Sequence, residues 1–232
     1  MVDADTAKTI VGIVGNVISF FLFLSPLPTI ITIFKKKSVE GFKPDPYVAT
    51  VLNCMMWILY GLPSVHPDSL LIITINGVGL AIEAIYVTVF IIYSPWPKRR
   101  KIIMAIIVEL IFMAIMVFIT LWELHTTKAR SALVGILCVV FNIMMYASPL
   151  TVMKRVITTK SVKYMPFPLS LANFCNGCIW ATYALLKFDP FVLIPNGLGA
   201  ISGLVQLILY ATFYGSTNWD EKPSEVELNG ET

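Results

Sequence analysis

The sequence is short of charge, cysteine and histidine. Only 13% of its 232 residues are charged, and it holds 4 cysteines and 2 histidines. All four cysteines fall inside apolar runs, so no disulfide framework is implied. Cys175-x-x-Cys178 has the spacing of a redox or metal pair. Because no histidine lies beside it, we interpret it as helix packing and predict no metal site.

These shortages also exclude several classes of function. His66 and His125 fall in predicted loops, and no residues are arranged as a nucleophile and its base. We therefore predict that the protein is not an enzyme and needs no cofactor. The net charge of +3 is accounted for by basic loops, so we expect contact with membrane lipid and no binding of nucleic acid.

Apolar residues dominate what remains, with 57% hydrophobic residues and a mean hydropathy of +0.79. Helices of about 20 apolar residues cross a hydrocarbon layer. The sequence therefore predicts an all-α membrane protein with seven transmembrane helices. We expect them at about residues 9–34, 45–63, 69–94, 102–123, 131–157, 164–186 and 191–214.

The distribution of Lys and Arg predicts the orientation, because basic residues in short loops stay on the cytoplasmic side. Three connections are basic, and the opposite side mixes basic with acidic residues. We therefore predict an extracellular N-terminus and a cytoplasmic C-terminus. The basic residues that place these connections inside are Lys35, Lys36, Lys37 and Lys43, then Lys98, Arg99, Arg100 and Lys101, then Lys154, Arg155, Lys160 and Lys163.

The sequence repeats itself at a separation of 123 residues, which becomes 120 after a shorter loop. The matched pairs are Gly12 with Gly135, Ser25 with Ser148, Pro26 with Pro149, Asn53 with Asn176, Trp57 with Trp180, Tyr60 with Tyr183 and, after the loop, Asn76 with Asn196. Three helices reverse the chain across the membrane, and one unmatched helix reverses it back. The two triplets are therefore predicted to be parallel repeats in a 3+1+3 arrangement.

This arrangement divides the chain into four parts. Residues 1–94 form the first three-helix repeat, 95–128 hold the linker helix, and 129–214 form the second repeat. Residues 215–232 are an acidic, polar segment that we predict to be a disordered cytoplasmic tail.

The duplicated side chains favour a sugar site. An amide both donates and accepts hydrogen bonds, as a sugar hydroxyl does, and an indole offers a flat apolar face to a pyranose ring. A plainer interpretation is that such Asn side chains join helices and such Trp side chains lie at the membrane interface. Duplication at matched depth in both triplets favours the binding interpretation.

Several motifs in this order resemble the SWEET (MtN3/saliva) family of sugar transporters. The resemblance runs from about residue 9 to 214 and is closest to the glucose and hexose carriers of plants. It rests on Gly15-Asn16, Leu24-Ser25-Pro26, Lys37-Ser38-Val39, Pro46-Tyr47, Thr74-Ile75-Asn76-Gly77, Tyr146-Ala147-Ser148-Pro149-Leu150, Lys160-Ser161-Val162-Lys163-Tyr164-Met165-Pro166-Phe167, Asp189-Pro190-Phe191 and Pro195-Asn196-Gly197.

The resemblance implies a role for each residue of the site. Asn76 and Asn196 would bind the sugar, with Trp57 and Trp180 above and below its ring. Leu22, Asn53, Met145 and Asn176 would form bulky walls that leave room for only one sugar ring. Ser19 and Asn142 would complete the pocket. Tyr60 and Asp189, with help from Tyr183, would close an extracellular gate.

Four prolines resemble the hinges of the family near the cytoplasmic entrance. Pro26 and Pro149 lie inside apolar runs, whereas Pro46 and Pro166 also fit helix starts. Pro46 lies seven residues before Asn53, but Pro166 lies ten before Asn176, so these two do not share the register of the repeat.

Two carboxylates, Glu83 and Glu109, lie deepest in the predicted helices, and neither has a partner in the repeat. We expect both to make structural hydrogen bonds. Glu83 lies two helical turns past Asn76 and is expected well below the pocket.

The sequence thus predicts a facilitative, bidirectional carrier of a monosaccharide, glucose or another hexose, that works by alternating access. The alternatives are a sucrose carrier of the same family and a seven-helix signalling receptor. A receptor would not need the duplication. The resemblance further implies a homo-oligomer, and the plasma membrane is the default location.

Overall fold

The computed structural model describes residues 3–219, and all of its regular structure is helical. The acidic stretch 220–232 of the predicted tail lies outside the described residues. In order, the elements are α1 (Ala4–Leu24), α2 (Leu27–Lys36), α3 (Asp45–Gly61), α4 (Leu70–Tyr93), α5 (Trp96–Phe118), the π-helical η1 (Ile119–Glu123), α6 (Thr127–Met145), α7 (Ala147–Thr159), α8 (Phe167–Leu186) and α9 (Pro190–Phe213).

Seven helical spans result, because α1 continues into α2, α5 into η1, and α6 into α7. Within residues 3–219, six spans have the length and hydropathy needed to cross a membrane. The remaining one, α3, has 17 residues, at the lower end of the range for a transmembrane helix. The structure therefore accommodates the seven expected crossings.

Two spans begin earlier than their apolar runs predict. α1 starts at Ala4 because the Asp3 side chain accepts a hydrogen bond of 2.6 Å from the Thr6 backbone N–H. α6 starts at Thr127 because Thr126 Oγ1 accepts one of 3.2 Å from the Ala129 N–H. These N-caps satisfy backbone N–H groups at the helix starts, so each helix begins several residues before its apolar run.

The basic residues 98–101 were expected in a loop and instead belong to the first turns of α5. Pro97 stands in the first turn of that helix, where its missing N–H costs nothing. Residues just after α9 also differ from the expected free tail, since Thr217 Oγ1 accepts a 2.9 Å hydrogen bond from the Val162 N–H.

Prolines break the first span of each half. α1 ends at Leu24, and α2 restarts at Leu27 with Pro26 as its N-cap. α6 ends at Met145, four residues before Pro149. A proline removes one helical hydrogen bond and crowds the carbonyl four residues earlier, so these bends follow from the sequence. The two spans thus bend at matched places in the repeat.

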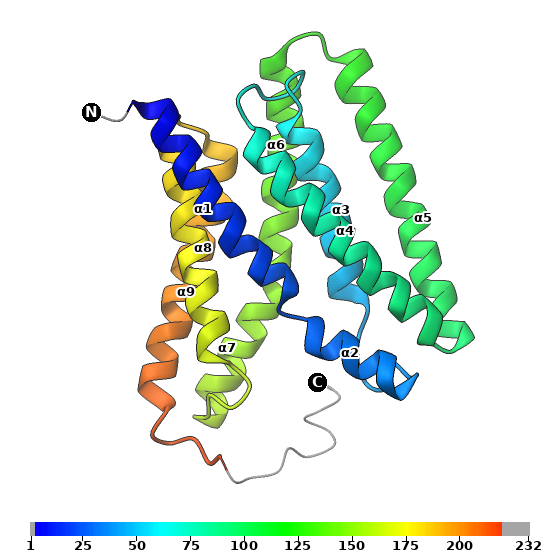
Figure 1. Cartoon of the computed structure of the whole chain (residues 1–232), viewed down its shortest axis with the longest axis vertical. Coiled ribbons are helices and arrows are strands. Elements are labelled where there is room, and N and C mark those ends of the chain that lie inside the picture. The colour runs from blue at the N-terminus through cyan, green and yellow to red at the C-terminus, as the bar shows by residue number, and fades with distance from the viewer. Residues whose placement is uncertain (1–2, 220–232) are drawn as a thin grey trace.

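The halves are assembled with the third span in the middle. α4 packs between α1 and α3, and α9 packs between α6 and α8. The halves meet where α1 contacts α8 and where α3 contacts α6, while α5 lies against α3 and α4 (Figure 1). The first span of each half therefore packs against the second span of the other half.

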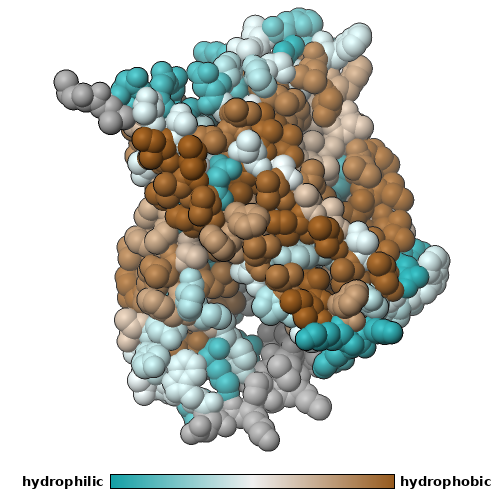
Figure 2. All heavy atoms as spheres, in the orientation of Figure 1, coloured by the Kyte–Doolittle hydropathy of each residue, from teal (hydrophilic) through white to brown (hydrophobic). Residues whose placement is uncertain are grey.

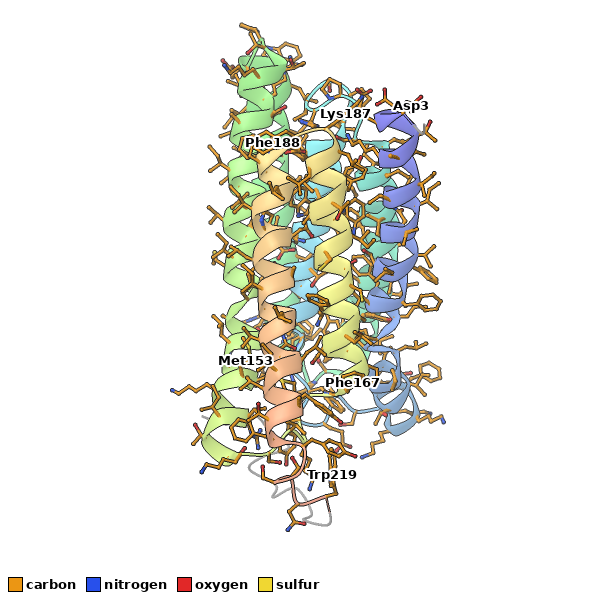
Figure 3. All side chains as sticks on the ribbon, turned by 90° about the vertical axis from the view of Figure 1, so that its left-hand side faces the viewer. Asp3, Met153, Phe167, Lys187, Phe188 and Trp219 are labelled. Carbon is orange, nitrogen blue, oxygen red and sulfur yellow. The ribbon has the colours of Figure 1, made fainter. Side chains whose placement is uncertain are left out.

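The bundle has two polar ends and an apolar waist. We call the end with the α2–α3, α4–α5 and α7–α8 connections the basic end, and the end with the start of α1 the N-terminal end. Figure 2 shows a wide hydrophobic band between hydrophilic groups at both ends. Figure 3 shows Asp3, Lys187 and Phe188 at the N-terminal end and Met153, Phe167 and Trp219 toward the basic end.

Glycines set how closely the helices of each half approach. A Cβ on Gly79 would lie 2.3 Å from the Phe23 ring, and a Cβ on Gly199 would lie 2.8 Å from Tyr146 Oη. Phe23 and Tyr146 are 123 residues apart, so in both halves an aromatic side chain packs against a glycine at a matched position. In the second half, a Cβ on Gly177 would also lie 2.5 Å from the Ala200 backbone nitrogen. α8 and α9 therefore pack backbone to backbone.

We predict that Gly177→Ala destabilises the protein by about 1–3 kcal/mol, because backbone and not a movable side chain occupies the space that the methyl group needs. Gly197→Ala is the matched control, since a Cβ on Gly197 would meet no neighbouring atom within 4 Å. Thermal unfolding in detergent measures both. Equal midpoints for the two variants would contradict the packing of α8 on α9.

Candidate functional site

A cavity of about 420 Å³ lies between the two halves, bounded by α1, α3, α4, α6, α8 and α9. The structure brings all ten predicted pocket residues to its wall. They are Ser19, Leu22, Asn53, Trp57, Asn76, Asn142, Met145, Asn176, Trp180 and Asn196. Their roles toward a ligand remain predictions, but their common location is a structural finding.

Asn76 on α4 and Asn196 on α9 have the same environment in the two halves. Asn76 Nδ2 donates to the Ile72 carbonyl at 2.9 Å, and Asn196 Nδ2 donates to the Val192 carbonyl at 2.8 Å. Each bond goes one turn back along the helix and fixes the amide. The carbonyl oxygen and the second N–H of each amide remain available to a ligand.

Asn53 and Asn176 join the halves. Ser19 Oγ donates to Asn176 Oδ1 at 2.6 Å, and Asn142 Nδ2 donates to Asn53 Oδ1 at 3.1 Å. Ser19 and Asn142 are repeat partners, as are Asn53 and Asn176, so one contact is the image of the other. The helix-joining role therefore applies to these two amides while they also line the cavity.

Trp57 and Trp180 are buried, with 7% and 6% of their surfaces exposed. Each packs edge-on against a tyrosine three residues later, Tyr60 at 5.5 Å and Tyr183 at 5.2 Å between ring centroids. Since α3 and α8 both run toward the N-terminal end, the two indoles lie at the same depth, one turn past Asn53 and Asn176. They flank that end of the cavity from two sides, and their placement against the two faces of a sugar ring stays a prediction.

The N-terminal end of the cavity is closed by a buried hydrogen bond between the halves. Tyr60 Oη lies 2.9 and 3.0 Å from the two carboxylate oxygens of Asp189. Asp189 also caps α9, accepting from the N–H groups of Phe191 at 3.0 Å and Val192 at 3.3 Å. Asp189 therefore both joins the halves through Tyr60 and caps the start of α9. Tyr183 instead points its hydroxyl at the Asp68 carbonyl, 3.4 Å away.

Sequence reasoning missed further contacts that reinforce this closure. Lys187 Nζ lies 2.5 Å from Asp5 and 3.3 Å from Asp68, linking the start of α1 with the α3–α4 and α8–α9 loops. His66 stacks on the Tyr60 ring with centroids 4.7 Å apart, and its Nε2 lies 3.7 Å from Asp189 Oδ2. These loop residues carry no repeat signal, so only the three-dimensional structure brings them together.

Toward the basic end the cavity continues past the predicted pocket. Thr50 and Asn173, which line this part, are separated by 123 residues and could have been found from the repeat. Figure 2 shows a gap between the halves at this end, beside α2 and α7. The structure is therefore closed at the N-terminal end and open at the basic end.

Glu83 corrects an expectation. It was expected well below the pocket with a structural hydrogen bond, yet it lines the cavity and is only 4% exposed. Among residues 3–219, its Oε2 has no hydrogen-bond partner. The error arose because spacing along α4 does not show how far the cavity extends. Glu109 Oε2 has no described partner either, but this residue lies at a separate hollow between α3 and α5.

Pro46 and Pro166 occupy different places at the starts of their helices, in line with their unequal spacing in the sequence. Pro46 is the second residue of α3, whereas Pro166 immediately precedes α8. The second residue of α8 is Pro168, which lies eight residues before Asn176, so neither Pro166 nor Pro168 matches Pro46 at the separation of 123 residues. The hinge role of Pro26, Pro46, Pro149 and Pro166 stays a prediction.

Comparison with known proteins gives consistent matches. The profile of the family described as "sugar efflux transporter for intercellular exchange" matches residues 9–98 and 132–218. The chain is 65% identical to the bidirectional sugar transporter SWEET5 of Arabidopsis thaliana over 98% of the chain and 95% of that protein. It is 59% identical to SWEET4 of the same organism over 96% and 88%.

A solved structure of a eukaryotic SWEET transporter superposes with a TM-score of 0.88 at 38% identity, covering 91% of this chain and 99% of that one. This match confirms the predicted fold class, an all-α membrane protein with seven spans in a 3+1+3 order.

We predict that Tyr60→Phe weakens the closed gate by about 1.5–3 kcal/mol, the range for a hydrogen bond to a charged group. Nitroxide labels at the exposed Leu70 and Leu185, one in each half, would report longer distances in this variant. Asp189→Asn tests the same bond while keeping a good N-cap residue. Distances unchanged from the unmutated protein in both variants would refute the gate.

His66 predicts a pH dependence for this closure, because it packs on Tyr60 and lies beside Asp189. Burial lowers the pKa of His66 from its ordinary 6.5, and Lys8 lowers it further, which outweighs the opposing effects of Asp189 and Asp68. If opening exposes His66, the open gate binds the proton more tightly than the closed gate. Lowering the pH below about 6.5 is therefore predicted to favour the open gate, because the open gate binds the proton more readily than the closed gate in that range.

The same labels check this prediction. The long-distance population should grow as the pH falls through this range, and His66→Gln should abolish the change. A pH response that survives in His66→Gln would assign it to another group.

Proposed function

The chain belongs to the SWEET (MtN3/saliva) family of sugar transporters, and on that premise we propose that its substrate is a hexose, glucose first. Membership makes the chain an integral membrane protein and a facilitative sugar carrier, not an enzyme. The proposal concerns which sugar it carries, which residues hold that sugar, and how the protein sits in the cell.

One observation supports the substrate most: a cavity with paired amides and paired indoles, sealed at one end and open at the other. Asn76 and Asn196 offer a carbonyl oxygen and an N–H from two sides, as a ring with hydroxyls around its edge requires. The cross-half bonds of Asn53 and Asn176 hold the walls close together. This narrowing favours one pyranose ring over two joined rings.

Transport follows from exchanging which end is sealed. A sugar enters from the basic end and displaces water between the paired amides and the paired indoles. It leaves by the other end once the hydrogen bond between Tyr60 and Asp189 breaks. The bends at Pro26 and Pro149 are placed to let the basic end close. Because a hexose is neutral, no charge moves with it, and its gradient sets the direction of flow.

We also propose the setting of this cycle. The basic end faces the cytoplasm, the N-terminus lies outside, and the plasma membrane hosts the protein. Several copies assemble as a homo-oligomer, with lipid around the apolar waist. These proposals rest on the charge distribution and on the family resemblance.

Uptake of radiolabelled glucose and sucrose in transport-deficient cells tests the substrate. We predict uptake of glucose well above that of sucrose, and a loss of at least about tenfold in Asn76→Ala and Asn196→Ala, since each removes an amide that bonds the sugar. Thr88→Ala on α4 and Thr212→Ala on α9 are matched controls, because both threonines are exposed and bond only their own helix. Faster sucrose uptake would establish a disaccharide carrier, and normal uptake by both Asn variants would refute the site.

A further inference from the structure

Glu83 is the one acidic residue at the wall of the central cavity, among the residues that the structure describes. Its side chain is more than nine-tenths buried, and its Oε2 has no hydrogen-bond partner among the described residues. A buried carboxylate without a partner is strongly unfavourable in the middle of a membrane protein. A ligand that donates hydrogen bonds from the cavity would supply what the protein does not.

The second half of the repeat carries no carboxylate at the position of Glu83. Its partner in the second half is Gly203, at a separation of 120 residues. A Cβ on Gly203 would lie 2.7 Å from the Phe174 Cα, so α9 touches the α8 backbone there. The first half instead holds a carboxylate at the cavity wall. This difference breaks the pseudo-symmetry of the cavity on its open side.

Two polar side chains accompany Glu83 along the same stretch of wall. Thr50 Oγ1 donates to the Pro46 carbonyl at 2.8 Å, which leaves its oxygen able to accept. Asn173 lines the cavity at the position of Thr50 in the second half, and its amide carries both donors and an acceptor. Glu83, Thr50 and Asn173 therefore provide a second set of donors and acceptors for sugar hydroxyls, apart from the central amides.

This second set lies apart from the central amides. Glu83 follows Asn76 by seven residues, about 10 Å along α4 at 1.5 Å per residue. α4 runs from the N-terminal end to the basic end, so the displacement is toward the open mouth. A hexose leaving Asn76 and Asn196 by this mouth must pass Glu83.

We propose that Glu83, Thr50 and Asn173 form a second hexose subsite between the central amides and the basic end. The proposal rests on hexose transport as proposed above. Two adjacent sugar hydroxyls donate to the Glu83 carboxylate, the strong class of hydrogen bond, while Asn173 and Thr50 bond the opposite edge of the ring. The subsite replaces water around the sugar in two steps, one at the mouth and one at the centre.

Glu109 offers a matched control. It is also a carboxylate within a span whose Oε2 has no described partner, but it lies at the hollow between α3 and α5 and not at the central cavity. A general effect of removing a membrane carboxylate would appear in both residues. An effect on sugar at the mouth would appear in Glu83 alone.

Protection of a cysteine at Leu169 by glucose tests the subsite. Leu169 lines the mouth one turn from Asn173 on α8. The experiment uses the purified full-length chain with Leu169→Cys, and with Cys175 and Cys178 replaced by serine, while Cys54 and Cys138 are buried. Alkylation by a maleimide is followed with saturating glucose or with mannitol at equal concentration.

We expect glucose to slow the alkylation at least threefold. The protection should persist when Asn76→Ala and Asn196→Ala are added, because the subsite is separate from the central amides. It should disappear in Glu83→Ala and fall in Glu83→Gln, whereas Glu109→Ala and Glu109→Gln should match the parent chain. If Glu83→Ala does not fold, two other comparisons replace it. Protection should be weaker in Glu83→Gln than in Glu109→Gln, and it should also fall in the double variant Thr50→Val with Asn173→Ala.

Protection that is absent, that vanishes with the central amides, or that is undiminished in the Glu83 variants would overturn the subsite. Glucose uptake by the parent chain separates this failure from failure of the proposed substrate. Uptake without the protection refutes only the subsite, and absence of uptake refutes the substrate.

Discussion

A side-chain amide inside a hydrocarbon layer costs several kcal/mol unless it finds a hydrogen-bond partner, and this cost organises the centre of the protein. Asn53 and Asn176 meet it by bonding Asn142 and Ser19 across the halves. Asn76 and Asn196 meet it only in part, through their own helices. The first pair therefore holds the halves together, and the second keeps hydrogen-bonding capacity for a sugar.

The same constraint explains why the two ends of the bundle differ. At the N-terminal end, the buried Asp189 carboxylate is satisfied by the Tyr60 hydroxyl and two backbone amides. At the basic end, Glu83 and Asn173 line an open cavity, and Glu83 Oε2 has no described hydrogen-bond partner. Closing one end satisfies its polar groups within the protein, while opening the other leaves its polar groups to water or sugar. A carrier with two alternately closed ends needs such a difference.

Much of this architecture follows from the sequence, because internal duplication is a strong signal. The 3+1+3 fold was predictable since apolar runs give the spans and the repeat gives the matched depths. The resemblance to the SWEET family was needed to add Ser19, Leu22, Asn142 and Met145 to the pocket. Helix starts such as Ala4 and Thr127 were missed because capping by Asp3 and Thr126 extends helices beyond the apolar runs. Contacts of the loops, such as His66 on Tyr60, have no periodic signal. The location of Glu83 depends on the depth of the cavity, which one helix alone cannot show.

The central claim is that a hexose binds between the two halves, beside Asn76 and Asn196. Determining the structure of the purified protein with saturating glucose tests this claim most directly. The account predicts density for one pyranose ring between these amides, on the side of Trp57 and Trp180 that faces the basic end. An empty central cavity at saturation, or sugar bound only outside it, would contradict the account.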